Sequence, residues 1–123
     1  MNPTKKLLIV DDDERNIFAL SAVLRSFNFE IETAYDGKMA YEILTKENNI
    51  DIVLMDIMMP VMDGYEAIRL IRQNDTLKDL PIIALTANAM KGDKEKCINA
   101  GANDYCSKPV DINVLLEKIQ ELK

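Results

Sequence analysis

Short apolar runs alternate with segments of helical periodicity along the whole chain. Five runs have extended character and are expected to be strands: 7–10, 30–35, 50–55, 81–85 and 104–107. After the first run, Ile17, Leu20 and Leu24 recur at steps of three and four, which is the period of an amphipathic helix. Most of the other intervening segments repeat this pattern, and a more polar helix is expected over about 88–99. The pattern therefore predicts five strands alternating with five helices.

Strands that alternate with helices form a parallel sheet covered on both faces. The runs 7–10, 50–55 and 81–85 are almost entirely apolar, as expected of central strands, whereas 30–35 and 104–107 are more polar, as expected of edges. We therefore predict one α/β domain over residues 1–123, a doubly wound, five-stranded parallel sheet of flavodoxin-like (βα)5 type with strand order 2-1-3-4-5. Such a sheet places its site at the carboxyl ends of the strands.

Composition narrows the possible functions. The 123 residues are 48% apolar and 29% charged, a balance typical of a globular domain rather than a disordered chain. The net charge of -6 argues against direct binding of nucleic acid. The sequence has no histidine, which excludes catalytic triads that use histidine, most zinc sites and phosphohistidine formation on this chain.

Two further features predict a cytoplasmic location and no membrane association. The apolar run nearest the N-terminus, residues 7–10, is too short for a signal peptide or a membrane span. Cys97 and Cys106 have no metal-binding spacing, and without an export signal we expect them to be reduced thiols.

Acidic side chains follow two of the central strands. Asp11 and Asp12 follow the first, and Asp56 closes the third. Three carboxylates that converge at one edge of a sheet repel one another unless a cation joins them. Hard oxygen ligands without histidine or thiolate favour Mg2+, Mn2+ or Ca2+ over zinc. The residues therefore predict a site for a divalent cation.

The other strand ends carry groups that suit a phosphoryl group. Thr86 and Ala87 end the fourth strand, and Lys108 follows the fifth. A lysine supplies a compact positive charge and a threonine a hydroxyl donor. A carboxylate such as that of Asp56 is a competent nucleophile that forms an acyl phosphate. Taken together, these residues predict a Mg2+-dependent phosphoryl acceptor. Asn16 is expected to cap or orient the first helix.

The set of motifs resembles the receiver domain of bacterial two-component response regulators. Four motifs carry the resemblance: Leu-Ile-Val-Asp-Asp-Asp at 8–13, Asp56 with Met59-Pro60 and Asp63-Gly64, Leu85-Thr86-Ala87, and Lys108-Pro109. No one motif decides it, but the set spans essentially the whole chain.

The resemblance implies a role for each residue of the site. Asp56 would be the phosphoacceptor. Asp12, Asp56 and the backbone carbonyl of Met58 would bind Mg2+, or Mn2+ in its place, with Asp11 supporting the ion through water. Autodephosphorylation would be tuned by Met58 and Asn88.

Other residues would respond to the phosphoryl group. The resemblance implies that Thr86, Ala87 and Lys108 bind it, and that the side chain of Tyr105 changes rotamer with the switch. It also implies a cis peptide bond before Pro109. Domains of this kind are switch proteins rather than enzymes, with self-phosphorylation and slow autodephosphorylation as intrinsic activities.

The implied partners are proteins. A histidine kinase or a histidine phosphotransfer protein would donate the phosphoryl group. A downstream protein would bind the surface formed by the helix near 88–99, the strand 104–107 and the helix that Asp111 caps. The segment 86–93, together with 108–111, looks most like receivers of hybrid histidine kinases, so a stand-alone receiver and a piece of a larger kinase both stay open.

Two alternatives compete with this interpretation. One is a degenerate receiver that acts only as a protein-binding module. The other is a flavin-binding flavodoxin, which the acidic segment after the first strand disfavours because carboxylates repel a phosphate.

Overall fold

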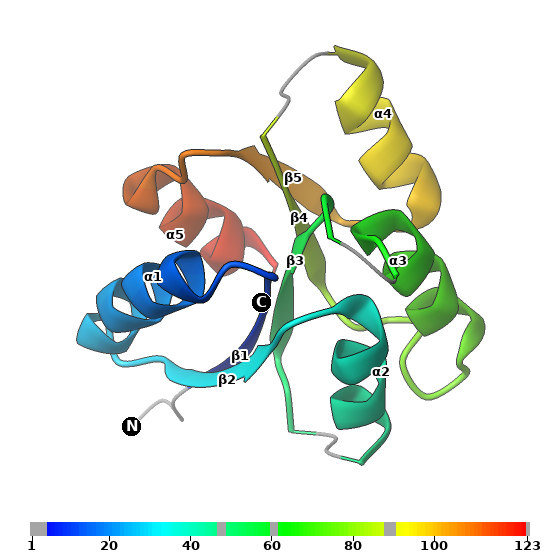
Figure 1. The fold of residues 1–123 in the computed structure, drawn as a ribbon, viewed down its shortest axis with the longest axis horizontal. Coiled ribbons are helices and arrows are strands. Elements are labelled where there is room, and N and C mark those ends of the chain that lie inside the picture. The colour runs from blue at the N-terminus through cyan, green and yellow to red at the C-terminus, as the bar shows by residue number, and fades with distance from the viewer. Residues whose placement is uncertain (1–4, 47–48, 60–61, 88–90, 123) are drawn as a thin grey trace.

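The computed structural model describes residues 5–46, 49–59, 62–87 and 91–122, with the side chain of Lys91 left out. Within these residues the chain alternates strictly between strand and helix (Figure 1). The strands are β1 (Lys6–Val10), β2 (Glu30–Ala34), β3 (Ile52–Asp56), β4 (Ile82–Thr86) and β5 (Asp104–Ser107). The helices are α1 (Glu14–Ser26), α2 (Gly37–Lys46), α3 (Gly64–Gln73), α4 (Lys91–Ala100) and α5 (Ile112–Glu121).

The strands form one parallel sheet in the order β2-β1-β3-β4-β5. This confirms the predicted fold class and strand order. The register pairs Val10 with Met55, Asp56 with Leu85, and Thr86 with Ser107. The carboxyl ends of β1, β3, β4 and β5 therefore lie side by side along one edge of the sheet. The polar residues that close or follow these strands in the sequence lie at this edge.

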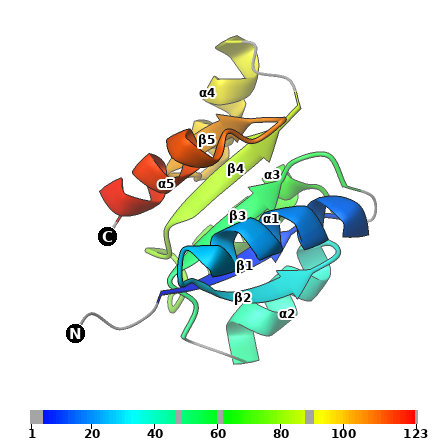
Figure 2. The ribbon, with the colours of Figure 1, turned by 90° about the vertical axis from the view of Figure 1, so that its left-hand side faces the viewer.

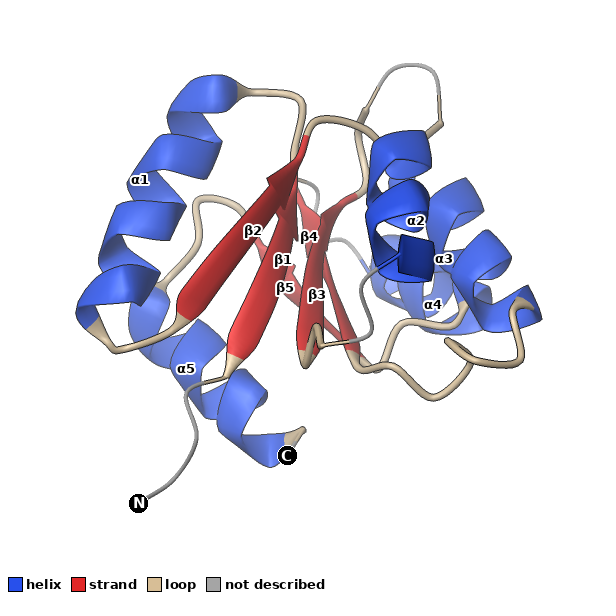
Figure 3. Ribbon diagram, turned by 90° about the horizontal axis from the view of Figure 1, so that it is seen from below, coloured by secondary structure: helices blue, strands red, loops and turns tan. Residues whose placement is uncertain are grey.

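Helices cover both faces of the sheet, as Figure 3 shows. Side chains such as Ile9 and Leu54 point to the face covered by α1 and α5, where they pack against Leu24 and Leu115. The alternate positions of the same strands point to the face covered by α2, α3 and α4. Because β1, β3 and β4 are covered on both faces, their sequences are nearly continuous apolar runs.

The expected role of Asn16 as a helix cap is wrong. The N-cap of α1 is Asp13, whose Oδ1 accepts a hydrogen bond of 2.9 Å from the backbone N–H of Arg15. Asn16 lies inside the first turn of the helix and is exposed. An aspartate directly before a helix satisfies an N–H group that lacks a partner within the helix, so Asp13 fills the role.

Several other expectations can be compared with the structure. Asp111 caps α5, as expected, and the two cysteines, Cys97 and Cys106, are free and buried. The expected start of the fourth helix near Asn88 lies outside the described residues, as does Pro60 of the motif around Asp56. None of the helices in the described part of the chain combines the length and the apolar character that a membrane span requires.

Candidate functional site

Three carboxylates meet at the carboxyl edge of the sheet, and we call Asp11, Asp12 and Asp56 the acidic cluster. Asp11 directly follows β1, and its backbone N–H extends the pairing with β2 by donating to the carbonyl of Ala34 at 3.1 Å. Asp56 is the last residue of β3. One carboxylate oxygen from each member lies within 4.8 Å of the others, and Asp11 and Asp56 are buried whereas Asp12 is exposed. The cluster is therefore open to solvent on the side of Asp12.

Lys108, the residue directly after β5, joins the cluster. Its Nζ lies 3.1 Å from Asp11 Oδ2 and 3.1 Å from Asp56 Oδ1. Its backbone N–H donates to the carbonyl of Thr86 at 2.8 Å, which fixes the start of the loop after β5 to the end of β4. The Lys108–Pro109 peptide bond is cis, the geometry expected for it. One cation thus faces two buried carboxylates and leaves the cluster with excess negative charge.

The protonation of the cluster reflects this imbalance. Burial raises the pKa of Asp56 to about 6, and the negative charge of Asp11 adds to the rise, while Lys108 and the backbone N–H of Met58 oppose it. Burial by itself lowers the pKa of Lys108, but the carboxylates of Asp56 and Asp11 more than compensate, so that the pKa of Lys108 is raised. Near neutral pH the lysine is therefore charged, and Asp56 is ionised at an energetic cost that a second cation would relieve.

The loop between β3 and α3 packs closely on Asp56. The backbone N–H of Met58 donates to Asp56 Oδ1 at 3.3 Å, and the N–H of Gly64 donates to the carbonyl of Ile57 at 3.0 Å. A Cβ atom at Gly64 would lie 2.5 Å from the carbonyl oxygen of Asp56, so only glycine permits this approach. The side chain of Met58 is 72% exposed beside the cluster. It is available to an incoming molecule rather than packed in the core.

The remaining predicted residues lie along β4 and β5. Thr86 ends β4 and is buried, and Ala87 follows it and is exposed. Tyr105 is partly buried on β5, where it packs against the core beneath α4. Asn88 lies outside the described residues. The predicted site residues that the structure describes therefore lie in β3, β4 or β5, or within two residues of the end of a strand.

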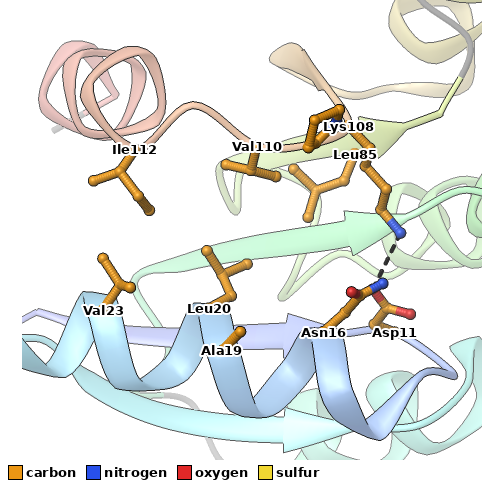
Figure 4. Close-up of a pocket in the computed structure, with 10 residues that line it drawn as sticks. Asp11, Asn16, Ala19, Leu20, Val23, Leu85, Lys108, Val110 and Ile112 are labelled. Atoms are coloured by element: carbon orange, nitrogen blue, oxygen red, sulfur yellow. Dashed lines mark hydrogen bonds and ion pairs between the residues drawn. The ribbon is translucent and has the colours of Figure 1, made fainter.

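An apolar groove next to the cluster was not predicted from the sequence. It has a volume of about 490 Å3 and runs between α1 and α5. Figure 4 shows Leu20 and Val23 of α1 facing Val110 and Ile112, with Asn16 at the end near Asp11. Val23 extends the apolar stripe of α1 beyond the buried positions. This extra apolar residue is the feature of the sequence from which the groove could have been predicted.

A family model described as "Response regulator receiver domain" matches residues 7–120. The chain belongs to this family. It is thus a receiver domain of two-component systems, a phosphoacceptor switch rather than a conventional enzyme. Receiver domains bind Mg2+ at an acidic pocket, and Asp11, Asp12 and Asp56 form a group of carboxylates that could hold a metal ion.

Relatives of this chain include histidine kinases and a response regulator. Hybrid signal transduction histidine kinase M of Dictyostelium discoideum is 42% identical over 120 residues, which are 94% of this chain and 5% of the kinase. The chain spans between 5% and 26% of the length of this kinase and other curated relatives. The receiver is therefore one part of much longer proteins among these relatives.

Two solved structures resemble this receiver closely. The receiver domain of sensor histidine kinase PA1611 from Pseudomonas aeruginosa PAO1, with a magnesium ion in its active site cleft, is 38% identical. Its TM-score is 0.89, with 98% of each chain covered. The receiver domain of Saccharomyces cerevisiae Ssk1, crystallised with the histidine phosphotransfer protein Ypd1, is 31% identical with a TM-score of 0.90, covering 99% of this chain and 90% of that one. The alternative of a receiver that acts only as a protein-binding module is not favoured.

Proposed function

We propose that Asp56 is the residue that accepts the phosphoryl group, and that the donor is a phosphohistidine of a histidine kinase or a histidine phosphotransfer protein. The observation that carries the proposal is the pair of 3.1 Å contacts from Lys108 Nζ to Asp11 and Asp56, inside a cluster whose carboxylate oxygens lie within 4.8 Å of one another. A carboxylate that can act as a nucleophile, a lysine ammonium and further carboxylate oxygens thus lie together, and this grouping supports the proposal.

The transfer moves one phosphoryl group and breaks one bond. A carboxylate oxygen of Asp56 attacks the phosphorus in line, an acyl phosphate P–O bond forms, and the P–N bond of the donor breaks. The imidazole leaves with the electron pair and takes up a proton. In such transfers the protein mainly positions the groups and neutralises charge. Lys108 is placed to hold a phosphoryl oxygen because its ammonium already contacts Asp56 at 3.1 Å.

We propose that the acidic cluster binds Mg2+, with Mn2+ as a substitute. Asp12, Asp56 and the backbone carbonyl of Met58 would be ligands, and Asp11 would act through water. Three carboxylates without histidine or thiolate are the donor set that hard divalent cations prefer. The ion, when bound, would neutralise charge that develops on the transferred group. The raised pKa of Asp56, caused by burial and by Asp11, supports a site that needs a second cation.

The phosphorylated state would be recognised through β4 and β5. Thr86 ends β4 and Ala87 follows it, and we propose that they and Lys108 bind the phosphoryl oxygens while Tyr105 changes its rotamer. A downstream protein would then bind the surface of α4, β5 and α5. The net charge of -6 supports a protein rather than a nucleic acid as this partner. The free, buried cysteines are in keeping with a cytoplasmic location.

Self-phosphorylation from small donors and slow autodephosphorylation complete the proposal. Met58 is exposed next to Asp56, where a side chain can control the approach of water to the acyl phosphate. Asn88 is the second residue proposed to tune this rate.

The decisive experiment measures the intact mass of the protein after incubation with acetyl phosphate, with Mg2+ or with a chelator. Wild type is expected to gain one phosphoryl group only with Mg2+, and Asp56→Asn is expected to gain none. Asp75→Asn is the matched control, since Asp75 is an exposed aspartate in the loop before β4. It should behave as wild type.

Two results would contradict the proposal. A phosphoryl group retained by Asp56→Asn would assign the acceptor to another residue. No gain in wild type at any time, together with no response to beryllofluoride and Mg2+, would favour the protein-binding module. Urea unfolding of Asp56→Asn shows whether that variant is folded.

A further inference from the structure

The aromatic ring of Tyr105 lies close to two ammonium groups from different helices. Lys94 Nζ of α4 and Lys118 Nζ of α5 each lie 5.4 Å from the centroid of the ring. Both distances fall within the range of about 6 Å in which a cation is attracted to an aromatic ring. Figure 2 shows β5, which carries the ring, at the edge of the sheet between α4 and α5. The ring therefore links two helices that flank the edge strand.

Lys118 is held in place by a second contact. Its Nζ lies 3.0 Å from Asp104 Oδ1, and both side chains are only about one-quarter exposed, at 23% and 26%. The same carboxylate oxygen accepts the backbone N–H of Tyr105 at 2.8 Å. Asp104 thus fixes the ammonium of Lys118 relative to the backbone that carries the ring. A partly buried, anchored cation loses less entropy on contact with the ring than a free one.

The strand that carries the ring leads directly into the acidic cluster. Ser107 pairs with Thr86, and the backbone N–H of Lys108 donates to the Thr86 carbonyl at 2.8 Å. Lys108 in turn contacts Asp56 at 3.1 Å. In this arrangement Asp56 is a carboxylate whose Oδ1 lies 3.1 Å from Lys108 Nζ and accepts a hydrogen bond of 3.3 Å from the backbone N–H of Met58. The present position of the Tyr105 ring therefore accompanies these contacts of the Asp56 carboxylate.

We propose that Lys94 and Lys118 are positioning residues that hold the Tyr105 ring in the arrangement of the unmodified receiver and so oppose switching. This inference rests on the proposed function, in which Tyr105 changes rotamer when Asp56 is phosphorylated. A ring that rotates away from its present position gives up both cation contacts. A contact that is made in only one of two states stabilises that state by its own free energy. The two lysines therefore set how much binding free energy the phosphoryl group must supply to move the ring.

The test titrates the Mg2+-loaded protein with beryllofluoride, the phosphoryl analogue, and measures its apparent dissociation constant. Lys94→Met keeps the length of the side chain and removes the charge. Because one exposed cation–ring contact has a small free energy, this variant is expected to bind beryllofluoride about two- to five-fold more tightly. Lys94→Arg is expected to retain the wild-type constant. Lys118→Met should shift in the same direction, although it also leaves Asp104 without its cation.

Lys96→Met is the matched control, because Lys96 is exposed on the same helix and its loss changes the net charge equally. It should bind beryllofluoride as wild type does. In a Tyr105→Leu background, Lys94→Met should have no effect, since the ring is gone. A two- to five-fold shift that appears in Lys96→Met, or that persists without the ring, would overturn the inference, as would an unchanged constant in Lys94→Met.

A second readout follows the ring itself. In protein labelled with 3-fluorotyrosine, the fluorine resonance of Tyr105 is assigned by its loss in Tyr105→Phe. Lys94→Met should move this resonance in the unliganded protein, and Lys96→Met should not. If wild type fails to bind beryllofluoride at all, the proposed function fails and the opposing role falls with it. If wild type binds and the lysine variants do not differ from it, only the present inference fails.

Discussion

Two polar clusters lie at opposite ends of the same sheet and follow opposite principles. At the carboxyl end, the acidic cluster gathers three carboxylates around a single lysine. At the amino ends of β4 and β5, one guanidinium is surrounded by oxygen atoms. Arg72 donates to the carbonyls of Gly101 at 2.8 Å and Lys78 at 3.0 Å, and to Asn103 Oδ1 at 2.8 Å. The first cluster carries unbalanced charge and the second has its donors matched by acceptors.

This difference in charge balance distinguishes a functional site from a set of hydrogen bonds that stabilises the fold. Burial lowers the pKa of Arg72, but its hydrogen bonds tie the end of α3 to the loops before β4 and β5 without any need for a ligand. In the acidic cluster the pKa of Asp56 is raised to about 6 by burial and by repulsion from Asp11, so the ionised form of Asp56 costs stability. Such a loss of stability is retained where the ionised carboxylate has a function.

Removing Arg72 should have the largest effect on stability. Arg72→Met deletes the donors to Gly101, Lys78 and Asn103 while keeping much of the apolar stem. Because hydrogen bonds from a charged group are stronger than neutral ones, we expect a loss of about 2–4 kcal/mol in the free energy of unfolding. Urea unfolding at pH 7.5 measures it. Arg69→Met, on the exposed side of the same helix, should change stability by less than about 0.5 kcal/mol.

An equal loss in both arginine variants would show that charge on α3, rather than the hydrogen bonds of Arg72, stabilises the fold. Phosphorylation of Arg72→Met by acetyl phosphate should still occur at temperatures where the variant is folded, because the two clusters lie at opposite ends of the sheet.

Substitution of Asp56 should raise the free energy of unfolding, whereas substitution of Arg72 should lower it. The pKa of Asp56 is about 6 in the fold, raised by burial and by Asp11 above its ordinary value of 3.8. The folded state therefore binds the proton more tightly than the unfolded chain, and the stability that this confers is present at low pH and is lost as the pH rises through about 6. Asp56→Asn removes this loss and should be more stable than wild type by about 1–3 kcal/mol at pH 7.5.

The gain should shrink as the pH falls through 6 toward 4, where Asp56 of the wild type becomes protonated. Urea unfolding in metal-free buffer at several pH values measures the gain, with Asp75→Asn as the matched control. A gain that stays constant with pH would contradict the assignment of the excess charge to Asp56.

Local sequence patterns were sufficient for the fold and for most of the site. The apolar runs and the helical period identified every element, because burial on both faces leaves few polar residues in β1, β3 and β4. The aspartates of the acidic cluster could be found because they follow those strands, and parallel strands bring their carboxyl ends together.

The amino-end cluster could not be found in this way. Arg72 meets its partners Gly101 and Asn103 across 29 and 31 residues, and each residue type is common in loops and helix ends. The contact of Lys94 and Lys118 with Tyr105 depends likewise on how α4 and α5 lie against β5. The error at Asn16 had a local cause, because the chain offers Asp11, Asp12 and Asp13 before the helix and only the backbone decides which one caps it.

The smallest predicted effect concerns a buried polar group that belongs to neither cluster. Ser21 of α1 is 3% exposed, and its Oγ has no hydrogen-bond partner among the described residues. Ser21→Ala removes an unpaired hydroxyl and adds helix propensity, so it should raise the free energy of unfolding by about 0.5–1 kcal/mol. Ser26→Ala is the control, because the hydroxyl of Ser26 is exposed and donates to the carbonyl of Val23. Ser21→Ala should leave the apparent dissociation constant for beryllofluoride unchanged, because Ser21 lies outside the acidic cluster and carries no charge. A gain in stability coupled to weaker beryllofluoride binding would instead extend the functional region into the core beneath α1.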